Sequence, residues 1–490
     1  MGENDTNQDD PYPSSRGRQY STFSSRKRLF PDVPDDLWDD WKWQFRNRIT
    51  TLAELERHFP LPEADRTKVR DVLHEFRLGI TPYYLSLIDP DDPADPLYRQ
   101  AVPTVEEFLN LNVGEDDPLA EDDFSPVPGI THRYPDRCLF VATNSCALYC
   151  RYCTRKRIME EGESPLPKSA LDAMIDYIAR TPQIRDVIVS GGDPLTWSTA
   201  RLEEVVSRLR AIPHVEIIRV GSRVPVTLPQ RVTPELCAML EKYYPLWINT
   251  HFNHPREITK EAALACERLL RAGIPVNNQA VLLRGVNDTP ETMRELVHGL
   301  MRIRVRPYYL YHCDPVKGAA HFRTSVKRGL EIIESLRGHT SGLAIPHYVI
   351  DAPGGGGKVP LLPNYLLAYQ NGRAIIRNFK GQIFEYDDPP DYDDAAVKPH
   401  PKLFFPKPQK AATGANGNGN GNGNGNGNGS GNGNGNGNGH LPHRHSWGIG
   451  AQSATSMRPD LKKLLVLPAG GNGTGNGNGG GHCNGHGHGS

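Results

Sequence analysis

Between residues 137 and 350, short apolar runs alternate with longer segments whose apolar residues recur every three or four positions. The short runs are rich in β-branched residues, which is typical of buried strands, and the longer segments have the period of an amphipathic helix. The pattern predicts strands over 138–143, 186–190, 215–220, 246–250, 276–283, 305–311 and 344–350. It predicts helices between them over 168–180, 199–211, 234–243, 259–272, 290–301 and 325–337.

Strands that are separated by single helices pair in parallel through right-handed crossovers, which leaves an α/β barrel or an open doubly wound sheet. Polar or glycine-rich motifs follow nearly every predicted strand, among them NSCALYC, SGGDP, GSRVP, HFNHP and DAPGGGGK. In a barrel, the loops after the strands share one rim and form one site. We therefore expect an α/β fold, built as a partial or complete TIM-like (βα) barrel.

The regions on either side of this alternation have a different character. Residues 1–30 are polar and we expect them to be disordered, whereas 31–130 predict a helical region, with one helical stretch that Asp36 could cap and that continues through Arg57. The barrel core should cover 131–358, followed by a C-terminal extension over 359–410. Residues 411–490 hold 26 of the 48 glycines and form a low-complexity Gly/Asn tail, too poor in apolar residues to offset its ordering entropy.

Charge and hydropathy exclude several classes of protein. The chain has 56 Lys and Arg against 57 Asp and Glu, so it lacks the basic surplus that favours nucleic-acid binding. No apolar run approaches the roughly 18 residues of a membrane span, and the acidic, polar start has no apolar signal region. We expect a cytoplasmic protein that binds neither nucleic acid nor membrane. The 8 cysteines then indicate metal binding or catalysis rather than disulfides.

The most informative motif is a CxxxCxxC directly after the first predicted strand, formed by Cys146, Cys150 and Cys153. Thiolates select iron–sulfur clusters or zinc. A structural zinc site usually has four ligands, and no fourth Cys or His is near. Three ligands fit an iron–sulfur cluster with one open iron better.

A second motif is Asp351-Ala-Pro-Gly-Gly-Gly-Gly-Lys358. The nucleotide-binding P-loop pattern does not fit, because Ala occupies position 352 and no Ser or Thr follows Lys358. A lysine after a flexible loop can form a Schiff base with pyridoxal phosphate (PLP). Considered by its chemistry alone, the segment reads more readily as a mobile surface loop.

The cysteine motif, with an aromatic residue before its last Cys, resembles the radical S-adenosylmethionine (SAM) superfamily. There the three Cys hold a [4Fe–4S] cluster and SAM chelates the fourth iron. SGGDP resembles the superfamily's second-strand motif, which contacts SAM. From about residue 36 to about 386, ordered blocks such as DDWKWQFRNRI, NSCALYCRYCTRKR, NTHFNHP and DAPGGGGKVPLLPNY resemble the lysine 2,3-aminomutase family, whose members also use PLP.

This resemblance implies a role for each matching residue. Lys358 would be the catalytic residue that anchors PLP, and Arg155 would bind the substrate α-carboxylate. The PLP phosphate contacts would be Arg133 and Tyr134. The residues near SAM would be Tyr152, Ser190, Gly191, Gly192, Asp193, His251 and Gln279.

Substrate choice follows from charge. A bound lysine carries an ammonium group at its far end, and burying that cation requires carboxylate partners. The family's two carboxylates map to Asp314 and Asp351, which favours a cationic amino acid. The implied reaction is the interconversion of L-lysine and L-β-lysine by 2,3-amino migration.

Several alternatives remain open. Arginine or another amino acid could be the substrate of a 2,3-aminomutase, and β-lysine could serve a protein-modification pathway. From a different class, the chain could be a non-catalytic iron–sulfur or PLP-binding scaffold. The resemblance also implies an electron donor such as flavodoxin or ferredoxin, and a homo-oligomer.

We expect no zinc site of the kind some family members have. Thr289 stands where those members place a Cys, and no Cys cluster follows the core. The tail residues His482, Cys483, His486 and His488 could bind a metal weakly, but histidines in a glycine linker are more often solvated.

Overall fold

The computed structural model describes residues 20–387 except 93, 160–161 and 371. The tail predicted over 411–490 and most of the predicted N-terminal segment lie outside these residues. A nine-stranded sheet forms the centre, with its strands in sequence order. The strands are β1 (Ile130–Tyr134), β2 (Arg137–Thr143), β3 (Asp186–Gly191), β4 (Ile217–Gly221), β5 (Leu246–Thr250), β6 (Val276–Leu282), β7 (Arg306–His312), β8 (His347–Ala352) and β9 (Gly357–Pro360).

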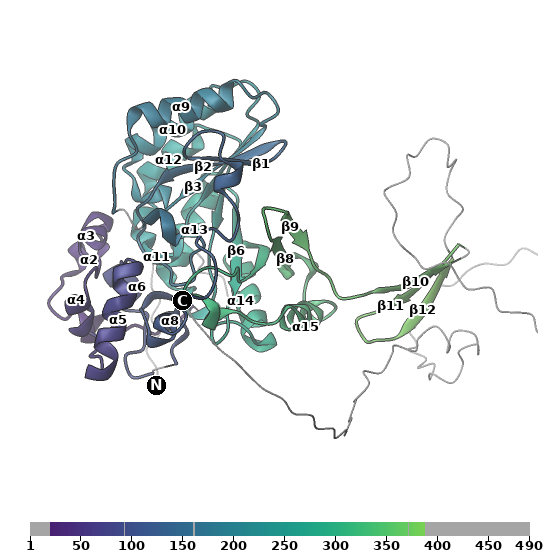
Figure 1. Ribbon diagram of the computed structural model, residues 1–490, viewed down its shortest axis with the longest axis horizontal. Coiled ribbons are helices and arrows are strands. Elements are labelled where there is room, and N and C mark those ends of the chain that lie inside the picture. Colours follow the sequence, from purple (N-terminus) through teal and green to yellow (C-terminus); the bar gives the residue numbers. More distant parts are fainter. Residues whose placement is uncertain (1–19, 93, 160–161, 371, 388–490) are drawn as a thin grey trace, which may run out of the picture. The chain divides into compact units, whose positions relative to one another are not determined.

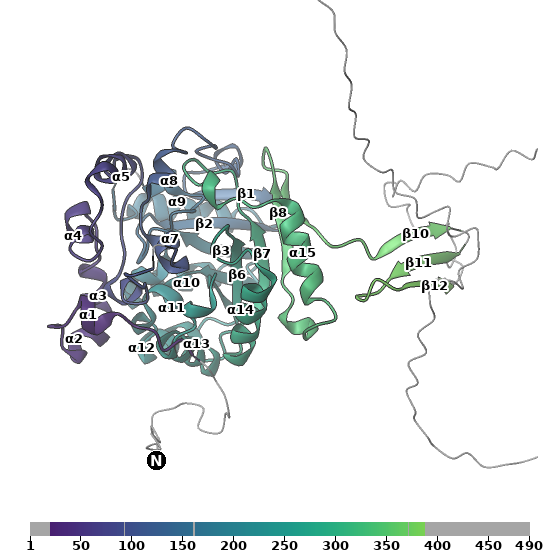
Figure 2. The same cartoon turned by 90° about the horizontal axis from the view of Figure 1, so that it is seen from below.

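Strands β2 to β8 pair in parallel, whereas β1 and β9 are antiparallel to their neighbours at the two edges. Residues in β2, β3 and β6 alternate between buried and partly exposed positions, because successive side chains point to opposite faces. The sheet curls into a barrel-like arrangement, with helices on its outside (Figures 1 and 2). The expected α/β barrel fold is confirmed.

The six crossover helices occupy the predicted positions with small shifts at their ends. Ser198, Thr259, Thr289 and Ser325 cap four of them through side-chain oxygens that accept backbone N–H groups. The helices are α9 (Lys168–Ala179), α10 (Thr199–Arg210), α12 (Pro234–Glu241), α13 (Lys260–Arg271), α14 (Pro290–Arg302) and α15 (Val326–Leu336), with a short α11 (Val224–Thr227) after β4.

The edge strands β1 and β9 were not predicted, and they bring the two ends of the sheet together. The Lys358 backbone N–H in β9 donates to Tyr134 Oη in β1 at 2.8 Å. This contact joins residues 224 positions apart. It places the glycine-rich loop beside the first strand of the barrel.

The N-terminal region is helical, but the single helix predicted from Asp36 through Arg57 is wrong. Asp40 has extended backbone angles and caps a new helix by accepting the Lys42 N–H, and Thr51 starts another through a capping box. Asp36 lies in the first turn rather than at the cap. The helices are α1 (Arg26–Leu29), α2 (Asp35–Asp39), α3 (Trp41–Arg46), α4 (Leu52–Glu56), α5 (Glu63–Glu75), α6 (Pro82–Leu85), α7 (Pro96–Ala101) and α8 (Val105–Phe108).

A second, antiparallel sheet follows the barrel, formed by β10 (Leu366–Gln370), β11 (Arg373–Arg377) and β12 (Ile383–Asp387). The sequence analysis did not anticipate it, because these short strands carry few of the buried alternations that mark the barrel strands. Among the described helices, none combines the length and apolar character that crossing a membrane requires.

Candidate active site

One cavity of about 650 Å³ opens at the carboxyl ends of the barrel strands. Every residue that the sequence analysis singled out as a site residue lines it, from the three cysteines at one end to Lys358, Asp314 and Asp351 at the other. The roles of the individual residues stay predictions. The parallel strands place their following loops on one rim, and the edge strands β1 and β9 add Arg133, Tyr134 and Lys358 to the same cavity.

The cysteine loop follows β2 and rests on the end of β3. Gly191 has a φ of +113°, and a Cβ there would lie 2.6 Å from the Thr143 carbonyl oxygen; a Cβ on Gly192 would lie 2.5 Å from that of Ser145. Only glycine permits this close approach. The two glycines therefore brace the backbone that leads into the cysteine motif.

The thiols of Cys146, Cys150 and Cys153 are free and face the cavity. Burial raises the pKa of Cys146 and of Cys153. Across the described part of the chain, no three His, Cys, Asp or Glu side chains are grouped to hold a single metal ion. Three thiols on one loop, with an open cavity in front, fit a multi-iron cluster with one open coordination site, because a cluster needs wider ligand spacing than one ion.

Asp193 lies below this loop and is fully engaged with the chain itself. Its Oδ1 accepts the Ser222 hydroxyl at 2.7 Å, and its Oδ2 accepts the backbone N–H of Arg223 at 2.7 Å and of Val224 at 3.1 Å. Burial raises the pKa of Asp193 to about 6. The carboxylate thus ties the loop after β3 to the loop after β4, beside its predicted role near SAM.

Tyr152, which lies between Cys150 and Cys153 in the sequence, and His251 line the cavity and contact each other. Their rings stack at 5.7 Å, and Tyr152 Oη lies 2.9 Å from His251 Nε2. The Asn253 side chain donates to Tyr152 Oη at 2.6 Å. Burial and the nearby Arg223 charge place the pKa of His251 well below its usual range, so this imidazole is neutral. Gln279 lines the cavity nearby, and its backbone bonds to the His251 ring.

At the other end of the cavity, β8 and β9 form a hairpin in which Asp351 and Lys358 are direct cross-strand partners. Gly354, Gly355 and Gly357 have φ values of +65°, +75° and +83°, which allow the tight turn between the strands. Lys358 Nζ lies 3.2 Å from both Asp351 carboxylate oxygens. The interpretation as a mobile surface loop does not describe this ordered hairpin.

The two carboxylates at this end differ in their surroundings. Burial and the charge of Asp351 raise the pKa of Asp314 to about 7. Arg133 Nη1 lies 3.9 Å from Asp351, and Arg133 Nε is buried without a hydrogen-bond partner among the described residues. A lysine, an arginine with an unused donor and an acidic pair are chemical partners that fit PLP and a cationic substrate.

Arg155 is held by a residue that the sequence analysis missed. Glu121 accepts from Arg155 Nη2 at 2.7 Å and from Nε at 3.0 Å, along one edge of the guanidinium. Among the described residues, none accepts a hydrogen bond from Arg155 Nη1. The other edge of the guanidinium is therefore open to a ligand carboxylate. Glu121 lies in a loop without a motif, so no local signal marks it.

The comparisons with known proteins agree with this site. The radical SAM superfamily profile matches residues 140–297, and a profile described as lysine-2,3-aminomutase matches 333–416. The barrel and its cysteine loop thus define a radical SAM protein.

Its relatives narrow the class. An L-lysine 2,3-aminomutase of Clostridium subterminale is 54% identical over 76% of this chain and 89% of its own length, and one of Bacillus subtilis is 52% identical over 74% and 77%. A glutamate 2,3-aminomutase of Clostridioides difficile is 48% identical over 73% and 85%. This chain belongs to the lysine 2,3-aminomutase family.

Proposed function

We propose that the protein interconverts L-lysine and L-β-lysine by 2,3-amino migration, with a [4Fe–4S] cluster, SAM and PLP as cofactors. The observation that carries the choice of lysine is the partly buried acidic pair Asp314 and Asp351 beside Lys358, in the cavity that the three cysteines also line. Overall similarity decides less, because the family includes a relative named for glutamate.

The charge of the far end of the cavity favours a cationic substrate. Asp351 already accepts one ammonium, that of Lys358, and Asp314 is buried with its pKa raised to about 7. Ionising Asp314 in this place requires a further cation nearby, which the side-chain ammonium of lysine provides. A substrate with a side-chain carboxylate would instead add a third negative charge.

The chain's own residues hold and orient the reactants. Cys146, Cys150 and Cys153 would hold the cluster, Lys358 would hold PLP, and Arg155 would bind the substrate α-carboxylate with its unused edge. When bound, the cluster and SAM supply the reducing electron and the hydrogen-abstracting radical. PLP supplies a ring that accommodates an unpaired electron.

The proposed partners follow from this function. A cluster that starts each reaction in its reduced state requires a one-electron donor protein such as flavodoxin or ferredoxin. We also propose a cytoplasmic location and a homo-oligomeric state; the free thiols of the described cysteines suit a reducing compartment.

The test is anaerobic reconstitution with iron, sulfide, PLP, SAM and dithionite, followed by incubation with lysine, arginine or glutamate and chromatography of the products. We expect β-lysine from lysine and no product from glutamate. Conversion of arginine without lysine would overturn the choice of substrate. Absence of both amino migration and SAM cleavage would favour the non-catalytic scaffold. The Lys358→Arg variant, which keeps the charge beside Asp351, provides the blank.

A further inference from the structure

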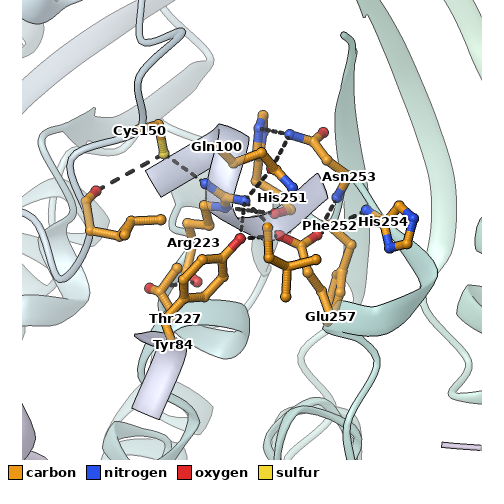
Figure 3. A network of polar contacts seen from close by, with 12 residues as sticks. Tyr84, Gln100, Cys150, Arg223, Thr227, His251, Phe252, Asn253, His254 and Glu257 are labelled. Atoms are coloured by element: carbon orange, nitrogen blue, oxygen red, sulfur yellow. Dashed lines mark hydrogen bonds and ion pairs between the residues drawn. The ribbon is translucent and has the colours of Figure 1, made fainter. Parts of the chain in front are cut away.

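Arg223, which follows β4, occupies a buried position beside the cysteine loop (Figure 3). It is 8% exposed, and all three nitrogens of its guanidinium have partners. Nη1 donates to Cys150 Sγ at 2.8 Å, Nε to the His251 carbonyl at 3.2 Å, and Nη2 to Glu257 Oε1 at 2.7 Å. The guanidinium therefore lies between a cluster-binding thiol and a buried carboxylate.

The surrounding contacts allow this side chain little freedom. Its backbone N–H is held by Asp193, and Nη2 also donates to Gln100 Oε1 at 2.7 Å. Glu257 is itself fully buried, and its oxygens accept the Tyr84 hydroxyl at 2.8 Å and the Asn253 backbone N–H at 2.6 Å. A buried ion pair with this many hydrogen bonds is well ordered, since each partner would lose its compensation by moving.

The three cysteines differ in their hydrogen-bond partners. Cys150 faces a guanidinium, whereas Cys153 Sγ accepts only a backbone N–H, that of Arg155, at 3.4 Å. At Cys146, the described contact goes to the backbone, where Arg48 Nη1 donates to its carbonyl oxygen. The strongest positive group is thus directed at one sulfur of the three.

Hydrogen bonds to the sulfurs and nearby charge set the reduction potential of an iron–sulfur cluster. Reduction adds one electron, and so one negative charge, beside the Arg223 guanidinium. A fixed cation there stabilises the reduced state more than the oxidised state. The neighbouring Glu257 works in the opposite direction, at a greater distance from the sulfur.

We propose that Arg223 is a positioning residue that orients Cys150 and raises the reduction potential of the cluster, so that a one-electron donor protein can reduce it. The proposal rests on the proposed function only in that the three cysteines hold a cluster. It does not depend on which amino acid is the substrate.

The experiment compares reconstituted wild-type, Arg223→Gln, Arg223→Lys and Glu257→Gln proteins by redox titration followed by electron paramagnetic resonance, without SAM or substrate. For Arg223→Gln we expect the ratio of reduced to oxidised cluster at a fixed potential to be about tenfold lower, which corresponds to a midpoint about 59 mV more negative for a one-electron couple. Arg223→Lys should give an intermediate midpoint. Glu257→Gln should shift the midpoint in the positive direction.

Arg231→Gln is the matched control. Arg231 is 1% exposed, and its guanidinium donates to the Leu195 and Trp197 carbonyl oxygens rather than to a sulfur. It should lower the unfolding temperature and leave the midpoint unchanged.

Three results would overturn the proposal. One is an unchanged midpoint in Arg223→Gln protein with full iron content. Another is a shift of the same sign in the Arg223 and Glu257 variants, which would indicate general disruption. The third is failure of both Arg223 variants to take up iron, which would assign Arg223 to assembly of the site. Absence of a cluster in the wild type would instead contradict the proposed function.

Discussion

The two ends of the cavity are built on opposite principles. Around the cysteines, the polar groups of Arg223, Glu257 and Asp193 are buried and paired with other groups of the chain. Around Lys358, Asp351 lies within 4 Å of the Lys358 and Arg133 cations, whereas burial and the charge of Asp351 raise the pKa of Asp314 to about 7. The buried charged groups at the first end are paired within the chain, whereas at the second end the protonated form of Asp314 is favoured.

This difference suits the two ends to different tasks. A redox centre benefits from a fixed surrounding, because fixed dipoles and charges need not reorganise when an electron arrives. A substrate site needs groups whose best partner is the ligand, and a carboxyl group that is costly to ionise without a cation meets that need.

Removing one of the three cluster-binding thiols should abolish activity. We expect Cys150→Ala protein to lose the iron–sulfur absorbance and all detectable amino migration, because two thiolates and SAM cannot replace the third ligand. Iron analysis and product chromatography measure this. Cys266→Ala, in the buried face of α13, is the control and should keep its iron. Full iron content in Cys150→Ala would contradict the ligand assignment.

Replacing Lys358, the predicted PLP anchor, should leave the iron–sulfur cluster intact. In Lys358→Arg protein the cation beside Asp351 remains, but no amine is available for PLP, so we expect activity to fall by about 1,000-fold or more. Absorbance of PLP should disappear on gel filtration while the iron content stays at the wild-type level. Retention of PLP by a covalent bond in this variant would point to another lysine.

Neutralising Asp314 should selectively lower the enzyme's efficiency with lysine. For Asp314→Asn we expect kcat/KM for lysine to fall about 100-fold, or about 3 kcal/mol, because the substrate ammonium loses a buried partner. Steady-state kinetics at pH 8 measure the effect, with Glu216→Gln on the exposed Arg185 pair as the control. An equal loss of SAM cleavage without substrate would indicate a structural defect instead.

The same carboxyl group should produce a pH dependence. With its pKa raised to about 7, Asp314 is protonated below that pH and cannot attract the substrate cation, and it is ionised above it. The value of kcat/KM for lysine, which reports groups of the free enzyme, should therefore rise about tenfold between pH 6 and pH 8. Asp314→Asn should flatten this rise. A profile that falls over this range would contradict the assignment.

The smallest effect should come from Glu121, which lines the cavity and pairs with Arg155. In Glu121→Gln protein the guanidinium loses one ionic partner, and we expect KM for lysine to rise about fivefold, or about 1 kcal/mol, with kcat little changed. A fall in KM would show that Glu121 competes with the substrate carboxylate for Arg155.

Much of this protein could be predicted where a signal is local. The seven parallel strands and six crossover helices follow from apolar periodicity, which each segment carries on its own. The breaks in the N-terminal helix were missed, because the caps at Asp40 and Thr51 compete with a propensity that continues across them. The edge strands β1 and β9 were missed, because their pairing partners, rather than their own pattern, define them.

The fold class follows from apolar periodicity that each segment carries on its own, and the cysteine motif lies within eight positions. The family follows from ordered blocks of sequence between about residues 36 and 386. Which side chains meet across the barrel depends instead on the tertiary structure. Arg223 reaches Cys150 over 73 positions, and Glu121 reaches Arg155 over 34. Such contacts depend on how the sheet curls and which loops share its rim. The pairing of Asp351 with Lys358 likewise arises from hairpin register, which no spacing of seven residues specifies alone.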